Sequence, residues 1–359
     1  MKVIITGGGT GGHLFPGVAV AEEFLRRDGA SRILFIGAKK GVEAAILPGL
    51  GFELATLDVA GIKGKGIWGT AKALCKIPQS LGRSFRIIRD FGPDILIGVG
   101  GYASGPAVLM ARLMGVRTAV MEQNAIPGIT NRLLGRFVDR AFVSFEETKK
   151  AFPEGKVLLT GNPIRADFLR AAEKNEEKGD RFTLLVFGGS QGAHRINMIF
   201  LEALRFLKMD RAKPRIIHQT GSADFETVKR AYGELGMEAD VRPFIQDMPR
   251  VFRSVDLLIC RAGATSIAEI TASGRAAILI PFPYAVHDHQ TKNAEVLARA
   301  GAAILAAEKD LTAEGLARTI DELYSDPRRL REMSEKSRAL GNVSAASDIV
   351  DECLRLVAA

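Results

Sequence analysis

The chain is organised around an apolar segment that stops at a run of glycines, Val3-Ile4-Ile5-Thr6-Gly7-Gly8-Gly9-Thr10-Gly11-Gly12-His13-Leu14-Phe15-Pro16. The apolar part has the length of a buried strand. Pro16 stands where a helix can begin, and Val18–Leu25 follows at helical spacing. A strand, a glycine turn and a helix in this order bring backbone N–H groups to an anionic or strongly polar ligand. The stretch therefore predicts an α/β fold with a ligand site at this turn.

A second stretch repeats the pattern about half a chain length later, Leu184-Leu185-Val186-Phe187-Gly188-Gly189-Ser190-Gln191-Gly192-Ala193-His194. Apolar runs of strand length alternate with helical patterns on both sides of a charged, apolar-poor segment, Glu173–Arg181. Such alternation is typical of doubly wound parallel sheets. We therefore expect two similar α/β halves, each directing one glycine loop at a shared cleft.

The composition is that of a globular protein with substantial cores. The chain has 359 residues, 47% hydrophobic and 25% charged, which is enough for two domains. No stretch reaches the ~18 apolar residues of a membrane span, and the apolar run after Met1-Lys2 is too short for the core of a signal peptide. Cys75, Cys260 and Cys353 are widely spaced, so we expect a reducing, cytosolic compartment. The net charge of +8 predicts an anionic partner.

Gly7, Gly9 and Gly12 satisfy the dinucleotide fingerprint Gly-x-Gly-x-x-Gly. That fingerprint also needs an acidic residue at the end of the second strand to bind a ribose. Here the second strand ends Gly37-Ala38-Lys39-Lys40, and the next acid is Glu43. An NAD-dependent oxidoreductase therefore remains only an alternative. A P-loop kinase or ATPase is disfavoured because its Gly-x4-Gly-Lys-Ser/Thr motif is absent.

Two histidines end the glycine loops. His13 is a candidate general base, because imidazole titrates near neutral pH; the alternative is a helix-start histidine packed against the sheet. His194 has the same two interpretations, and for this residue we favour the structural one.

The segment Cys260–Glu269 predicts a second polar turn. It follows an apolar strand, turns on Gly263 and offers N–H groups with Thr265 and Ser266 at a helix start. Glu269 falls about one turn into that helix, where a carboxylate can accept two hydrogen bonds from a ribose cis-diol. The alternative is a solvated glutamate that interacts with the helix dipole.

The loop Pro281–Asn293 contains His287, Asp288 and His289, a grouping that could indicate a metal. No further Cys/His cluster accompanies these residues, and the chain contains no Asp-x-Asp pair. We therefore expect hydrogen bonding to a polar ligand here, with no metal and no cofactor.

The region Ile62–Arg89 is basic and contains no acid. Its bases are Lys63, Lys65, Lys72, Lys76, Arg83, Arg86 and Arg89, and its apolar residues include Trp68 and Phe85. This composition describes a surface that docks on anionic lipid, to which each base contributes about 1 kcal/mol. The alternative is a basic helix that packs its apolar face inward. Nucleic acid is disfavoured because no readout motif accompanies the charge.

In its motifs the chain resembles the MurG family, bacterial transferases that move N-acetylglucosamine from UDP-N-acetylglucosamine (UDP-GlcNAc) onto lipid I to make lipid II. The resemblance covers nearly the whole length. The motifs that carry it are Gly7–Pro16, Gly100–Pro106, Glu122–Asn124, Gly161–Arg165, Gly188–Ala193, Phe244–Met248, Arg261–Glu269 and His289–Ala294.

The resemblance implies a GT-B fold, which consists of two Rossmann-like domains facing a cleft. It implies an acceptor and membrane-facing domain over residues 1–162, a UDP-GlcNAc domain over 163–342, and a C-terminal helix, 343–359, that packs back on the first. It also implies inverting, metal-independent transfer to the 4-hydroxyl of the N-acetylmuramyl sugar of lipid I. The enzyme would be peripheral, at the cytoplasmic face of the cell membrane.

The resemblance also implies the substrate-binding residues. They are Thr10, Gly11, Gly12, Asn124, Arg165, Ser190, Ile245, Ala264, Thr265, Glu269, His289 and Gln290. Ile245 would contact uracil through its backbone, and Glu269 would bind the ribose diol. Ser190 and the Ala264–Thr265 turn would hold the pyrophosphate, and Arg165 and Gln290 would assist with phosphate or sugar. The remaining residues, Thr10, Gly11, Gly12 and Asn124, would complete the site across the cleft.

The position of His289 can carry Gln in the family, so an imidazole would replace an amide there. His13 is the candidate base, and Tyr102 is a weaker candidate for acceptor contact, with packing at the sheet edge as its alternative. Two other functions stay open beside the oxidoreductase. One is a sugar-nucleotide sensor without turnover, and the other is a GT-B transferase that builds glycolipids on another acceptor.

Overall fold

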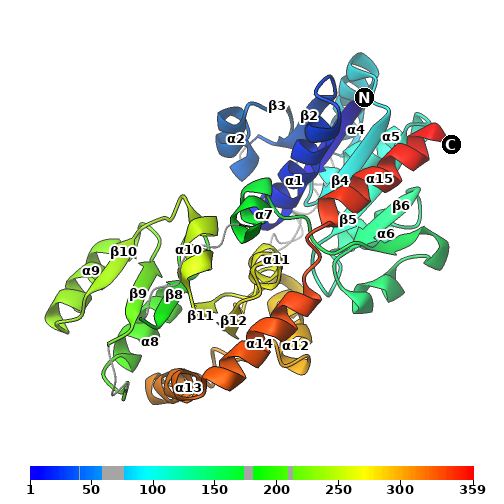
Figure 1. Cartoon of the computed structure of the whole chain (residues 1–359). Helices are drawn as coiled ribbons and strands as arrows, with labels where there is room; N and C mark the ends of the chain where they lie inside the picture. The colour runs from blue at the N-terminus through cyan, green and yellow to red at the C-terminus, as the bar shows by residue number, and fades with distance from the viewer. Residues whose placement is uncertain (40, 59–76, 174–180, 209–212) are drawn as a thin grey trace. The chain divides into compact units, whose positions relative to one another are not determined.

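The computed structural model describes residues 1–39, 41–58, 77–173, 181–208 and 213–359 (Figure 1). These residues form two compact units, one of Met1–Ala166 with Asn342–Ala359 and the other of Asp167–Gly341. The boundary was expected after residue 162; it falls after Ala166, so Arg165 belongs to the first unit. The basic segment predicted to dock on lipid lies outside the described residues over 59–76.

The first unit is built on a parallel sheet of seven strands in the order β3-β2-β1-β4-β5-β6-β7. In the register of the central strands, Ile4 lies beside Leu34 on one side and Leu96 on the other. The strands are β1 Lys2–Gly7, β2 Arg32–Ala38, β3 Glu53–Leu57, β4 Ile95–Gly100, β5 Arg117–Glu122, β6 Arg140–Val143 and β7 Val157–Leu159.

Helices cover both faces of this sheet, as strand alternation requires. Val3 and Ile5 of β1 pack with apolar residues of α1 and α15, whereas Ile4 packs with residues of α4 and α5 on the other face. The helices of the unit are α1 Gly11–Arg27, α2 Val42–Ile46, α4 Ile77–Phe91, α5 Ser104–Leu113, α6 Ile129–Leu134 and α15 Ala345–Ala358, with 3-10 turns η1 Pro48–Leu50, η2 Glu146–Ala151 and η3 Glu154–Lys156.

The C-terminal helix α15 lies against α1 (Figure 1). The resemblance implied a C-terminal helix over 343–359 that packs back on the first domain. Ile349, Val350 and Cys353 enter the apolar cluster of the first unit. At its edge Arg27 pairs with Asp351, and Arg140 Nε donates to Glu352 Oε1 over 2.6 Å.

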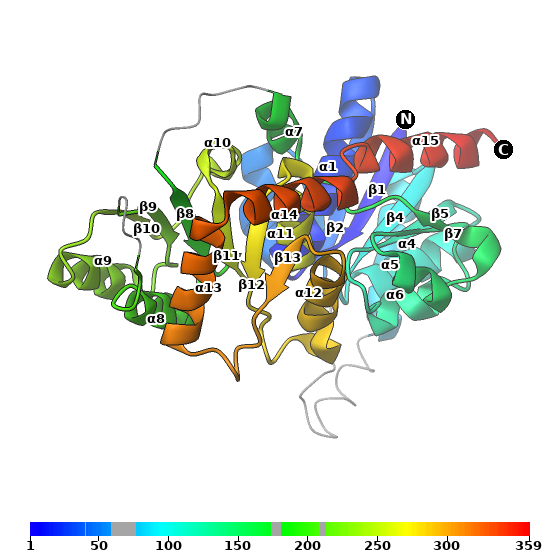
Figure 2. The same cartoon turned by 60° about the horizontal axis from the view of Figure 1, so that its bottom comes forward.

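The second unit contains a six-stranded parallel sheet in the order β10-β9-β8-β11-β12-β13 (Figure 2). Its strands are β8 Thr183–Phe187, β9 Arg215–Gln219, β10 Ala239–Arg242, β11 Leu257–Cys260, β12 Ala276–Leu279 and β13 Ala303–Leu305. Its helices are α7 Ala166–Glu173, which begins at the unit boundary, α8 His194–Ala203, α9 Phe225–Glu234, α10 Met248–Ser254, α11 Ala264–Ser273, α12 His289–Arg299, α13 Ala313–Ser325 and α14 Pro327–Leu340, with the 3-10 turn η4 Val286–Asp288.

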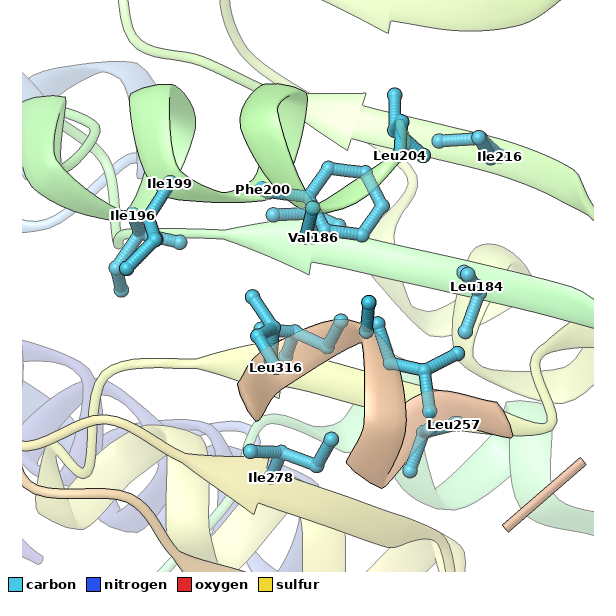
Figure 3. Packing of buried hydrophobic residues seen from close by; sticks show 14 of the residues in the cluster. Leu184, Val186, Ile196, Ile199, Phe200, Leu204, Ile216, Leu257, Ile278 and Leu316 are labelled. Atoms are coloured by element: carbon cyan, nitrogen blue, oxygen red, sulfur yellow. The ribbon is translucent and has the colours of Figure 1, made fainter. Parts of the chain in front are cut away.

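The core of the second unit fills the space between its sheet and the helices α8 and α13 (Figure 3). Val186 of β8, Phe200 of α8 and Leu316 of α13 are almost fully buried there. Both units are thus parallel sheets between helices, which confirms the predicted α/β class with two Rossmann-like domains.

Candidate active site

Each sheet reverses its winding direction at one point. In the first unit successive strands run outward from β1 and β4, and in the second from β8 and β11. Ligands of doubly wound sheets bind beyond the carboxyl ends of the strands at this switch point. The glycine loops quoted above follow β1 and β8, so the topology places both loops at switch points.

Close approach of two loops explains the glycines of the first site. Gly7, Gly8 and Gly101 all have positive φ, between 82° and 139°. A Cβ on Gly7 would lie 2.2 Å from the carbonyl oxygen of Gly100, and one on Gly101 would lie 2.5 Å from that of Gly8. The amide of Gly8 donates to Gly100 O over 3.2 Å. The loops after β1 and β4 are therefore held directly against each other.

The side chain of Glu43 stabilises this loop through hydrogen bonds with backbone amides. Its side chain is buried, and its carboxylate accepts hydrogen bonds from Gly9 N at 2.9 Å and Ala38 N at 2.7 Å. A Cβ on Gly8 would lie 2.7 Å from this carboxylate, so glycine is needed there. The first acid after β2 thus serves the glycine loop itself, which further weakens the oxidoreductase alternative.

The next turn of chain contains Thr10, Gly11, Gly12 and His13. Thr10 is the N-cap of α1, and its carbonyl accepts from the amides of His13 and Leu14. The half-buried ring of His13 has its Nδ1 3.1 Å from Gln123 Oε1. His13 therefore stands at the switch point on a helix start, with one ring nitrogen engaged by the protein.

A buried polar cluster follows β5. The carboxylate of Glu122 accepts from the backbone amides of Asn124 and Gly128, each at 3.0 Å, and from Asn131 Nδ2 at 3.0 Å. Asn124 itself is half-buried, and its carbonyl accepts from Thr148 Oγ1. This cluster fixes the backbone at Asn124 beside the switch point.

Two other predicted residues lie on later loops of the first unit. Tyr102 follows β4 and is 49% exposed, which leaves its ring accessible to a ligand. The guanidinium of Arg165 lies 5.3 Å from the ring centroid of Phe15, a residue of α1. This cation–π contact holds Arg165 next to α1, the helix whose first turn contains His13.

In the second unit the loop with Ser190 approaches the loop after β9. A Cβ on Gly192 would lie 2.0 Å from Thr220 O, and one on Gly221 would lie 2.2 Å from Gln191 O. Ser190 is exposed at the tip of this loop. The two halves thus use the same device, a glycine contact between neighbouring loops.

Gln219 connects this loop to Ile245, and sequence reasoning missed it. The buried amide donates through Nε2 to Gly189 O at 3.0 Å and accepts through Oε1 from Ile245 N at 2.8 Å. The amide of Ile245 is therefore engaged within the protein, which leaves its carbonyl for the backbone contact that the resemblance implies.

Ala264, Thr265 and Glu269 lie on α11, directly after β11. Gly263 is the N-cap of this helix, and no side chain caps it. The helix N-terminus therefore presents backbone N–H groups and its positive dipole end beside the Ser190 loop. Glu269 is half-buried one turn along and is close enough to Cys260 to contribute to the raised pKa of that thiol, whose main cause is burial.

His289 and Gln290 begin α12, after β12. Gln290 Oε1 accepts from Phe282 N at 2.9 Å, which closes the loop between them. His287 and Asp288 adopt positive φ of 55° and 54°, a conformation strained for side-chain-bearing residues. Both are exposed, and among the described residues no group of three or more His, Cys, Asp or Glu could hold a metal ion.

His218 is a buried histidine that organises the second unit. Its ring contacts Asn197 Oδ1 at 3.1 Å and Tyr232 Oη at 3.0 Å. Burial lowers its pKa to about 3, so the ring is neutral. Asn197 in turn donates to Thr220 O and Asp224, while exposed His194 contacts Asp224 through Nδ1 at 2.9 Å. His194 therefore has a structural partner.

The predicted residues of each unit thus lie at the carboxyl edge of its sheet, after β1, β4, β5 and β7 in the first and after β8, β10, β11 and β12 in the second. A surface cavity of about 410 Å³ in the second unit lies elsewhere, along α8 and the start of α13, and contains none of them.

Comparison with known proteins defines the class. Residues 3–143 match the glycosyltransferase family 28 N-terminal domain, and residues 183–352 match the glycosyltransferase family 28 C-terminal domain. The structure superposes on the crystal structure of Acinetobacter baumannii MurG with a TM-score of 0.79 and 30% identity, covering 99% of both chains. The two units are therefore the two domains of a GT-B glycosyltransferase.

Relatives of similar sequence show to which family of glycosyltransferases the chain belongs. A protein of Syntrophus aciditrophicus is 58% identical over 99% of both chains, and one of Geobacter sulfurreducens is 50% identical over 98% of both. Each is named UDP-N-acetylglucosamine–N-acetylmuramyl-(pentapeptide) pyrophosphoryl-undecaprenol N-acetylglucosamine transferase. The chain belongs to the MurG family, as its motifs predicted.

Proposed function

We propose that this enzyme transfers N-acetylglucosamine from UDP-GlcNAc to the 4-hydroxyl of the N-acetylmuramyl sugar of lipid I, giving lipid II with inversion at the anomeric carbon and without a metal ion. The observation that carries the proposal is the 58% identity over 99% of the chain to a relative named for this donor and acceptor.

The donor is assigned to the second unit. Ser190 and the start of α11 offer a glycine loop and a helix N-terminus, which suit a pyrophosphate. The carboxylate of Glu269 suits a ribose diol, and the carbonyl of Ile245 suits the N3–H of uracil. Gln290 and His289 at the start of α12 would hydrogen-bond the sugar or phosphate.

Chemistry needs a base and a stabilised leaving group. His13 would take the proton of the acceptor hydroxyl as that oxygen attacks the anomeric carbon, a contribution of about 10²–10⁴ in rate. UDP leaves with the bonding electron pair, and helix N-terminal amides with Arg165 would stabilise its new charge. Thr10, Gly11, Gly12 and Asn124 would complete the substrate site, with Tyr102 toward the acceptor.

The acceptor's lipid chain calls for a membrane-docking surface, which we assign to the outer side of α4, α5 and α6. These helices are neighbours in the first unit. The exposed apolar residues of these helices and of the turn after α6 are Phe85, Leu109, Leu113, Ile129, Leu133 and Phe137. The exposed bases of the same segments are Arg83, Arg86, Arg89, Arg112, Arg132 and Arg136. Apolar side chains among bases suit anionic lipid at the cytoplasmic face. No helix in the described part of the chain is long and apolar enough to cross a bilayer.

The decisive experiment incubates the purified enzyme with labelled UDP-GlcNAc, UDP-glucose or UDP-N-acetylgalactosamine and a short-chain lipid I analogue. The proposal expects a disaccharide product from UDP-GlcNAc only, with a β linkage, and undiminished turnover in EDTA. An α linkage would refute inversion, loss of turnover in EDTA would refute metal independence, and absence of product from UDP-GlcNAc would refute the function.

A further inference from the structure

Gln123 makes three hydrogen bonds at the end of β5, and the function described above assigns it no role. Its side chain is 1% exposed. Nε2 donates to the carbonyl oxygens of Val99 at 3.1 Å and Met121 at 3.3 Å. Oε1 lies 3.1 Å from His13 Nδ1.

These contacts determine where the proton of the histidine lies. A carbonyl oxygen can only accept a hydrogen bond, so the NH₂ end of Gln123 must face Val99 and Met121. The oxygen end then faces His13, and a carbonyl-type oxygen needs a donor. His13 Nδ1 must therefore carry the hydrogen, and in the neutral ring Nε2 carries the lone pair.

The ring has little freedom to escape this arrangement. Gly100, with φ of 99°, lies against the ring, so that a Cβ there would be 2.9 Å from His13 Nδ1 and 3.0 Å from Cε1. The main chain of His13 is fixed in the first turn of α1. A 180° rotation about the Cβ–Cγ bond would put the carbon Cδ2 in the place of Nδ1 and leave Gln123 Oε1, a buried acceptor, without its donor.

We propose that Gln123 is a positioning residue that holds His13 in the Nδ1–H tautomer and so makes Nε2 the basic nitrogen. The inference rests on the proposed role of His13 as the base. In the step it supports, Nε2 takes the hydroxyl proton of the acceptor as the new oxygen–carbon bond forms. The bond from the anomeric carbon to the phosphate oxygen breaks with its electron pair, and Nδ1–H stays hydrogen-bonded to Gln123 throughout.

The first test reads the tautomer directly, without turnover. Long-range ¹H–¹⁵N spectra of the ¹⁵N-histidine-labelled protein distinguish protonated from unprotonated ring nitrogens, and the His13 signals among the five histidines are those that vanish in His13→Ala. We expect a protonated Nδ1 and an unprotonated Nε2 at neutral pH. The reverse pattern, which is the one favoured by free histidine in water, would overturn the inference.

The second test compares two substitutions that differ in the contact to His13. Gln123→Leu and Gln123→Glu both remove the amide NH₂ that donates to Val99 and Met121. Glu retains an acceptor for Nδ1–H and adds a carboxyl group, so the tautomer is recorded beside kcat for each variant. Gln123→Leu should lose the Nδ1–H pattern and lower kcat by about 10²-fold, with the KM for UDP-GlcNAc changed less than about 2-fold. Gln123→Glu should keep the Nδ1–H pattern and recover most of kcat.

The outcomes separate this inference from the function on which it rests. Equal losses of kcat in both variants, or a tautomer unchanged in Gln123→Leu, would make Gln123 a structural residue and leave His13 as the base. Full activity of His13→Ala would instead refute the base, whatever the tautomer. The matched control is His194→Ala, the histidine at the second glycine loop, which should keep the wild-type kcat.

Discussion

Replacing Glu43 with Gln tests whether a buried carboxylate supports the first glycine loop. Glu43 accepts from Gly9 N at 2.9 Å and Ala38 N at 2.7 Å, with its two oxygens divided between them. Gln can accept at only one of these positions and turns an NH₂ toward the other amide. One charge-assisted hydrogen bond is lost and a buried N–H is left without an acceptor, which costs about 2–4 kcal/mol.

The size of this loss can be measured in two ways. For a unit of this size, 2–4 kcal/mol lowers the Tm of the transition by about 4–16 °C. Because the protein has two units, hydrogen exchange should localise the effect, with faster exchange at Gly9 or Ala38 and unchanged protection in the second unit. Glu154→Gln, at an exposed carboxylate of the same unit, is the control and should stay within about 0.5 kcal/mol of wild type. A Glu43→Gln protein as stable as this control would refute the bracing role.

Four further outcomes follow from the structure. His13→Ala should lower kcat by about 10²–10⁴ while UDP affinity, measured by calorimetry, is unchanged; a parallel loss of UDP binding would make His13 a donor-binding residue. Gln219→Leu should mainly raise the KM for UDP-GlcNAc, because it releases both Gly189 and Ile245, and an unchanged KM would contradict the bridge. Arg83→Glu with Arg86→Glu should abolish binding to phosphatidylglycerol vesicles in a flotation assay, whereas Arg195→Glu with Arg205→Glu, the same charge change on exposed residues of the second unit, should not. Burial lowers the pKa of His218 from 6.5 in the unfolded chain to about 3 in the folded protein, so the stability that depends on its neutral ring is complete above pH 6.5 and is lost toward pH 3. Urea titrations should therefore show about 1.4 kcal/mol less stability for each pH unit that the pH falls over this range. His218→Gln should flatten this pH dependence, and an unchanged slope would show that His218 is not its source.

The fold could be predicted from the sequence because parallel strands buried on both faces are short apolar runs that end at turns. The apolar run Leu184–Phe187 was predicted as a strand, and β8 spans Thr183–Phe187. The second strand was expected to end at Gly37-Ala38, and β2 ends at Ala38. Such runs carry their own signal, since their burial depends on local composition and alternation with helices.

The residues that hold the site loops in place, Gln123, Gln219 and Glu43, could not be predicted in the same way. Gln123 and Gln219 have partners far away in the sequence, His13 and Val99 for the first and Gly189 and Ile245 for the second. Nothing local distinguishes a glutamine with such partners from one that is solvated. Glu43 carried a weak signal as the first acid after β2, but its partners depend on a loop that returns to it from β1. Long-range contacts of this kind require the fold first.

Glu43 and Gln219 also give the two glycine loops different electrostatic environments, although the sequences of the loops are alike. In the first unit an anionic carboxylate, Glu43, takes the Gly9 amide. In the second unit the corresponding bridge is the neutral amide of Gln219, which accepts from Ile245 N and donates to Gly189 O. A diphosphate bound at the first loop would meet a negative charge that has already used one of the loop's N–H donors, whereas Gln219 brings no charge to the second loop and Asp224 there is paired with His194 and Asn197. This difference supports the assignment of the nucleotide to the second unit. It also leads us to expect that Gln219→Glu, which introduces the charge of the first loop into the second, weakens UDP binding more than Gln219→Leu does; equal affinities of the two variants for UDP would refute the electrostatic reasoning.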